Sequence, residues 1–132
     1  MKTPERLKVG TDEVAIHVSS GALLATEVTI PPGGGPPAMH RHPSEELYRV
    51  VSGELAIYLD GERIVAPAGS VTHIPGGMPH NVRNESGDEA QAYVVFSPGT
   101  EFEAFVRAVA ADPANVIAHA QANGIEFTEP PH

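Results

Sequence analysis

The chain has 132 residues, enough for one domain with a buried core but not for two. Its 17 acidic and 8 basic residues give a formal net charge of -9, and the basic residues are scattered, which argues against a nucleic-acid surface. No cysteine is present, so disulfides, thiolate metal sites and thiol nucleophiles are excluded. No apolar run approaches the roughly 20 residues of a membrane span. We therefore expect one cytoplasmic domain over residues 1–132, without a secretion signal, membrane contact or nucleic-acid partner.

The first third of the chain predicts a polar lead-in followed by two strands. Residues 1–10 are a polar segment that we expect to pack loosely or to cross to a partner. Residues 14–18 and 22–30 predict strands, with a turn at residues 19–21. The sequence PPGGGPP at residues 31–37 excludes a central strand and predicts a loop.

Short apolar runs separated by turns continue to residue 96. They predict strands at residues 47–51, 55–59, 64–66, 70–74, 80–83 and 90–96. Asp60-Gly61 marks a hairpin between two of them. The total of roughly eight to ten short strands predicts an all-β fold, a small barrel or jelly roll. We expect this barrel to span residues 12–98.

The C-terminal quarter predicts two short helices over residues 100–124. Thr100 and Glu103 match a capping box, so the first helix is expected to begin near Glu101. Apolar residues follow at helical spacing and predict a stripe that packs against the outside of the barrel: Phe102, Phe105, Val106 and Val109. Asp112-Pro113 predicts a second helix, and residues 125–127 are expected to add an edge strand or to cover the barrel.

Two sequence blocks in the middle of the chain share a fixed spacing of histidine, glutamate, glycine and proline. The first, GGPPAMHRHPSEELYRVVSG at residues 34–53, has His-x-His, three residues and then Glu46 between two glycines. The second, GSVTHIPGGMPHNVRN at residues 69–84, has Pro-x-Gly, two residues and then His80. These blocks resemble the two motifs of the cupin superfamily. The resemblance implies a small double-stranded β-helix that binds one metal ion through His40, His42, Glu46 and His80.

Strand geometry gives an independent argument for the first block. In a strand, alternate side chains share a face, so His40 and His42 would point the same way, about 7 Å apart at Cα. Glu46 has the same parity and Glu45 the opposite one, so parity selects Glu46. A turn at residues 76–79 redirects the chain so that His80 enters the barrel from another strand.

The phrases at residues 28–55, 77–84 and 93–99 look most like single-domain bacterial cupins of the quercetin-dioxygenase-like group. That resemblance implies a dioxygenase-type oxidoreductase in which Glu46 holds the metal and also acts as the catalytic base. One divalent transition metal, Fe, Mn, Ni, Cu or Zn, suits this donor set. Candidate residues for the wall of the small-molecule substrate pocket are Tyr48, Val50, Ile57, Met78 and Phe96.

Several alternatives stay open from the sequence. With three Tyr, four Phe and no Trp, a small enolic, phenolic or diketone-like substrate is as consistent as a flavonol-sized one. An oxygen-independent isomerase, lyase or decarboxylase, or a non-catalytic metal- or small-molecule-binding cupin, would use the same ligands. The other histidines, His17, His73, His119 and the terminal His132, are not expected to bind the metal. Because cupins commonly pair through sheet edges, we expect a homodimer.

Overall fold

The computed structural model describes residues 4–129, and these form strands and two α-helices around one hydrophobic core. The strands are β1 (Glu5–Val9), β2 (Asp12–Ser19), β3 (Leu24–Ile30), β4 (His40–Arg41), β5 (Glu45–Ser52), β6 (Glu54–Leu59), β7 (Glu62–Pro67), β8 (Val71–Ile74), β9 (His80–Arg83), β10 (Ala90–Ser97) and β11 (Glu126–Phe127). The helices are α1 (Thr100–Ala111) and α2 (Val116–Ala122), joined by a 3-10 turn, η1 (Pro113–Asn115).

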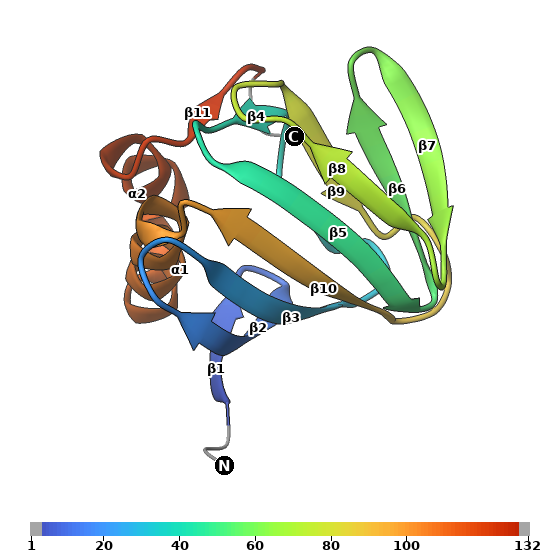
Figure 1. Ribbon diagram of the computed structural model, residues 1–132, viewed down its shortest axis with the longest axis horizontal. Helices are drawn as coiled ribbons and strands as arrows, with labels where there is room; N and C mark the ends of the chain where they lie inside the picture. The colour runs from blue at the N-terminus through green and yellow to red at the C-terminus, as the bar shows by residue number, and fades with distance from the viewer. Residues whose placement is uncertain (1–3, 130–132) are drawn as a thin grey trace.

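The strands form two antiparallel sheets (Figure 1). The six-stranded sheet has the order β1-β2-β3-β10-β5-β8, and the five-stranded sheet has the order β11-β4-β9-β6-β7. Alternation along β5 buries Glu46, Tyr48 and Val50 and exposes the residues between them. The same alternation in β10 supplies buried residues from the next strand of the sheet. The predicted all-β fold with two short C-terminal helices is confirmed.

Residues 5–9 are more ordered than the sequence indicated, and residues 1–3 of the expected lead-in lie outside the described part of the chain. Within the expected loose lead-in, β1 pairs with β2, and Leu7 lies opposite Val14. Leu7 and Val9 occupy alternate positions of β1 and pack against the core. The expectation of loose packing is wrong for this strand, because two apolar residues among charged ones are enough to define an amphipathic edge strand.

The first helix begins at Thr100, but the predicted capping box does not form. The Thr100 hydroxyl donates to the Gly21 carbonyl, and the Glu103 carboxylate accepts from Ser19 and Arg107. These side chains therefore attach the helix to the turn between β2 and β3, where α1 packs on β1 and β3 (Figure 1). In the part of the chain that the structure describes, neither helix has the length and apolar character to span a membrane.

The loop that precedes β4 packs closely against the backbone of β9 at Gly35. Gly35 has φ +117°, and a Cβ atom added there would lie 2.3 Å from the Val82 carbonyl oxygen. Gly61 has φ +76° but no atom within 4 Å of an added Cβ. Gly35→Ala therefore combines left-handed strain with a clash, whereas Gly61→Ala adds only the strain. We expect Gly35→Ala to lower the free energy of unfolding by about 1–3 kcal/mol more than Gly61→Ala, measured by urea denaturation. Equal losses would contradict the close contact.

Candidate metal centre

Three histidines meet between the two sheets. His40 in β4 lies directly opposite His80 in β9, and opposed residues of an antiparallel pair share a face. His42 follows directly after β4. One ring nitrogen from each of these three side chains lies within 4.8 Å of the others, and all three residues are buried. We call His40, His42 and His80 the His cluster.

Glu46 reaches the His cluster from the six-stranded sheet. Its Oε1 atom lies 2.9 Å from His42 Nε2 and 3.4 Å from His80 Nε2. Its neighbour Glu45 faces outward instead, where its carboxylate contacts His73 and accepts from the Gly76 N–H. Within β5, strand parity thus distinguishes the buried carboxylate from the exposed one.

The path of the chain differs from the single strand that the first motif suggested. β4 ends at Arg41 in the five-stranded sheet, and β5 begins at Glu45 in the six-stranded one. The chain therefore changes sheets between His42 and Glu46, and parity does not carry across this loop. The argument from one continuous strand is wrong at this point. The side chains converge because the two sheets face each other.

The turn of the second motif packs directly on the first motif. The Gly77 N–H donates to the His42 carbonyl over 2.8 Å. A Cβ atom added to Gly76 would lie 2.3 Å from the Pro43 carbonyl oxygen, so a larger residue there would push the two segments apart. This contact fixes the turn that leads into β9 and so positions His80.

Each imidazole of the His cluster is oriented by a carbonyl two residues away. His40 Nδ1 lies 3.0 Å from the Ala38 oxygen, and His80 Nδ1 lies 2.9 Å from the Met78 oxygen. His42 Nδ1 lies 3.2 Å from the Ser44 oxygen, beside the Ser44 hydroxyl. A carbonyl can only accept, so each Nδ1 carries a proton. In the neutral rings the lone pair is therefore on Nε2, the atom that a metal would bind.

The lone pairs of His42 and His80 face the Glu46 carboxylate. This arrangement is the main test of whether the residues fit a metal ion. His42 Nε2 and His80 Nε2 are buried and have no hydrogen-bond partner. Two acceptors 2.9 Å apart, such as His42 Nε2 and Glu46 Oε1, repel each other unless a cation lies between them. A proton or a metal ion supplies that cation. Three imidazoles and one carboxylate are a common donor set for transition metals, so the residues fit.

The charges of the centre agree with this arrangement. Burial, with help from the nearby His80, lowers the pKa of His40 to about 4, so this ring is neutral at physiological pH. Burial alone would raise the pKa of Glu46, but its interactions with His42 and His80 outweigh burial and lower the pKa to about 2. Burial opposes protonation of His80 as well, yet Glu46 raises the pKa of that ring above its ordinary value. Glu46 and His80 therefore each favour the charged form of the other.

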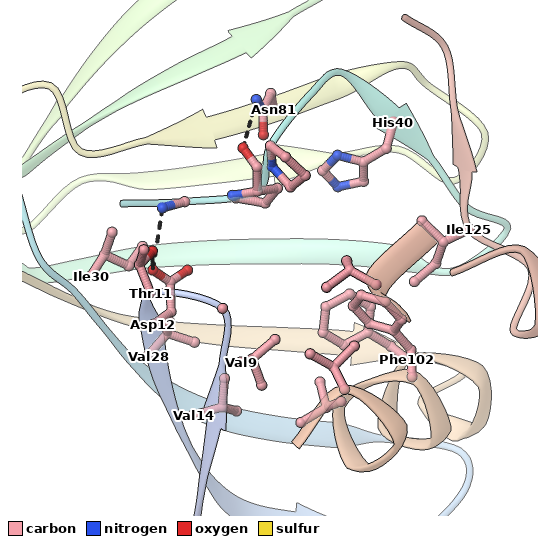
Figure 2. Close-up of a pocket in the computed structure, with 18 of the residues that line it drawn as sticks. Val9, Thr11, Asp12, Val14, Val28, Ile30, His40, Asn81, Phe102 and Ile125 are labelled. Atoms are coloured by element: carbon pink, nitrogen blue, oxygen red, sulfur yellow. Dashed lines mark hydrogen bonds between the residues drawn. The ribbon is translucent and has the colours of Figure 1, made fainter. Parts of the chain in front are cut away.

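The centre opens into a cavity of about 1000 Å³. In Figure 2, His40 and Asn81 lie on one side of this space, and Val9, Val14 and Val28 lie on the opposite side. Phe102 and Ile125 close one end beside the helices. His40 and Glu46 both line the cavity, and His42 and His80 lie behind them, outside its lining.

The predicted pocket residues separate into two groups. Tyr48 and Phe96 line the cavity. Val50 and Ile57 are instead packed in the hydrophobic core, and Met78, half-buried, is outside the cavity lining. Strand alternation identifies the residues that face the barrel interior. It does not distinguish the end of the barrel that is filled by core side chains from the end that holds the cavity.

Several residues that shape the cavity were not predicted from the sequence. Val9 and Asp12 come from the β1–β2 hairpin, which was expected to be loose at its start. The apolar stripe of α1 does pack as core, but Phe102 and Val106 also face the cavity. Helical periodicity predicts that one face of the helix is buried, but it does not show that this face also lines a cavity.

The remaining histidines lie away from the centre. His17 is exposed and contacts the Tyr93 ring, and His73 is exposed and contacts Glu45. His119 on α2 contacts Asp112. His132 lies outside the described residues. Asn84 is fully buried and donates to the carbonyls of Ile30, at the end of β3, and of Asp88, in the loop before β10.

Two facing antiparallel sheets around a buried histidine and carboxylate cluster define a small β-barrel with a candidate metal site. The Cupin domain family model matches residues 26–96, more than half of the chain. The chain therefore belongs to the cupin family.

The chain is also similar to solved structures and to one curated relative. A protein from Thermus thermophilus is 30% identical, with a TM-score of 0.59 over 64% of this chain and 83% of that one. A predicted oxalate decarboxylase from Thermotoga maritima is 24% identical, with a TM-score of 0.60 over 72% of this chain and 91% of that one, and shares the fold. An uncharacterized protein from Streptomyces coelicolor is 40% identical over 57 residues, 43% of this chain. The chain spans about half, 53%, of the length of that relative.

Removing any one donor should weaken metal binding. We expect His40→Ala, His42→Ala, Glu46→Ala and His80→Ala each to weaken the affinity for Zn(II) at least about tenfold, or about 1.4 kcal/mol, by competition with a chelating dye. His73→Ala and Glu45→Ala are matched controls, because they remove the same side chains from the outer face. Unchanged affinity in His80→Ala would exclude this site.

Metal binding should also depend on pH in a defined direction. Imidazole binds a metal only when it is neutral, so protons compete with the metal. Because Glu46 raises the pKa of His80, this competition should begin above pH 6.5. We expect the affinity to fall about tenfold per pH unit on acidification below the raised pKa.

The carboxylate variant Glu46→Gln provides the control for this pH dependence. Without the negative charge, the pKa of His80 is no longer raised, and the fall in affinity should move to lower pH. A titration of Zn(II) affinity between pH 8 and pH 5 would measure both proteins. Superimposable pH profiles would contradict the coupling between Glu46 and His80.

Proposed function

We propose that this protein is a metal-dependent cupin enzyme of the dioxygenase type that acts on an enolic, phenolic or diketone-like compound. The observation that carries the proposal is that His40 and Glu46 both line a cavity of about 1000 Å³. A metal that only stabilises a fold is enclosed by its ligands, whereas a catalytic site stays open to substrate. The resemblance of both motifs to the quercetin-dioxygenase-like group supports the type of reaction.

The His cluster and Glu46 would hold the ion. When bound, a divalent transition metal supplies a Lewis acid with free positions for a substrate oxygen and, if it is redox-active, for dioxygen. The carbonyls of Ala38, Ser44 and Met78 keep the imidazoles in the orientation that this requires.

The chemistry of Glu46 favours an acidic substrate hydroxyl. The low pKa of about 2 means that this carboxylate is ionised at neutral pH and is a weak base. So weak a base could take a proton from a substrate hydroxyl only if a bound metal lowered the pKa of that hydroxyl, and an enol or phenol would need far less lowering than an aliphatic alcohol. Tyr48 lies beside Glu46, and burial, together with the Glu46 charge, raises the pKa of its phenol. Tyr48 therefore stays protonated and can donate to an oxygen in the centre.

One alternative reaction uses the same groups. A carboxylate next to a cavity can shuttle a proton without oxygen, as an isomerase, lyase or decarboxylase requires. The fold that this chain shares with a predicted oxalate decarboxylase is compatible with that chemistry. A non-catalytic binding cupin would retain the ligands but lack turnover.

Oxygen uptake distinguishes these reactions. Protein loaded with Fe(II), Mn(II) or Ni(II) should consume oxygen with a panel of enols, phenols and diketones, as followed by an oxygen electrode. Glu46→Gln should lower kcat at least about 100-fold, because the base is lost. Glu45→Gln, which changes the exposed neighbour, should leave kcat unchanged.

Two outcomes would contradict the proposal. Turnover of a substrate in the absence of oxygen would select the oxygen-independent reaction. Metal-loaded protein that binds such substrates but never converts them would identify a binding protein.

A further inference from the structure

We infer that the ligand of the cavity has two unlike ends: an oxygen-bearing head at the His cluster and an uncharged, apolar body along the cavity wall. The head rests on the proposed function. The apolar body follows from the residues of the cavity wall. Phosphorylated sugars and small dicarboxylates are excluded by this account.

The wall is apolar and only partly shielded from water. Val9 and Val28 from the first strands and Phe102 from α1 line the cavity and pack against the core, yet each is only half-buried. Their exposed surface faces the inside of a concavity rather than the outside of the molecule (Figure 2). Contact with water there is unfavourable in proportion to area, so an apolar ligand would be stabilised by covering it.

The cavity has no cation available for an anionic body. Among its described lining residues, Arg83 is the sole arginine or lysine, and its guanidinium already donates to the carbonyls of Gly33, Gly35 and Pro36. His40 also lines the cavity, where it is a candidate metal ligand rather than a free cation.

The other charged lining residues are acidic. Asp12, Glu46 and Glu85 all face this space, and the Asp12 carboxylate already accepts from the Gly35 N–H. A phosphate or a second carboxylate on the ligand would therefore be repelled rather than paired.

The apolar wall begins immediately beside the metal centre. The His42 ring lies 5.9 Å from the Phe102 ring and 6.1 Å from the Phe96 ring, measured between centroids. Phe96 and Phe102 stack on each other with centroids 3.9 Å apart. These rings lie next to a metal donor, so the hydrocarbon skeleton of the ligand would begin next to its oxygen atoms.

A series of hydroxamic acids tests both ends of the ligand at once. The probes are acetohydroxamate, hexanohydroxamate, octanohydroxamate and benzohydroxamate, titrated by calorimetry into Zn(II)-loaded protein, which has no redox chemistry. Each buried methylene should tighten binding up to about fourfold, so octanohydroxamate should bind at least about 100-fold more tightly than acetohydroxamate. Oxalate and ribose 5-phosphate should bind more weakly than hexanohydroxamate. Equal affinities across the alkyl series, or tighter binding of either anion, would overturn the inference.

A nearly isosteric substitution keeps the test independent of folding. Val28→Thr adds a hydroxyl to the wall, while Val71→Thr adds the same hydroxyl to the exposed outer face of β8. Val28→Thr should weaken octanohydroxamate about three- to tenfold and leave acetohydroxamate unchanged. Val71→Thr should change neither. A Val28→Thr effect of the same size on both probes would contradict contact between the chain of the ligand and this wall.

The same titrations separate failure of the inference from failure of the proposed function. Loss of acetohydroxamate binding on removal of Zn(II) supports the metal-held head, whatever the alkyl series shows. Tighter binding of longer chains supports the apolar body, even if no oxygen chemistry is ever found.

Discussion

The repulsion between buried imidazole nitrogens and the Glu46 carboxylate is the constraint on which the site depends. Backbone carbonyls hold the protons on Nδ1 and turn the Nε2 lone pairs of His42 and His80 toward an ionised oxygen. Such an arrangement is stable in a buried site only with a cation between the groups. The donors come from both sheets, so a cation there also links β5 to β4 and β9.

The rest of the barrel keeps these groups together. Gly76 and Gly77 allow the turn before β9 to touch the loop after β4, which brings His80 beside His42. At the other side of the centre, the packing of α1 on β1 and β3 closes one end of the cavity with aromatic and aliphatic side chains. The same elements that complete the core therefore also decide what can approach the donors.

The sequence was informative where residue spacing reflects local geometry. Motif spacing selected Glu46 and brought together the three histidines that the fold does place together, and alternation within β5 buries Glu46 and exposes Glu45. The predictions from sequence failed where tertiary contacts determine the structure. The change of sheets after Arg41 is set by the facing strands. The capping box does not form because Thr100 and Glu103 instead contact the segment at residues 19–21. Likewise, inward parity did not distinguish Tyr48 at the cavity from Val50 in the core.

The central claim is that the His cluster and Glu46 hold a cation through Nε2 atoms and a carboxylate oxygen. X-ray absorption spectroscopy of the Zn(II)-loaded protein tests this most directly, because imidazole rings produce characteristic multiple scattering. The account predicts three imidazole ligands with Zn–N distances of about 2.0–2.1 Å, together with oxygen. A coordination shell of oxygen alone, without imidazole scattering, would contradict it.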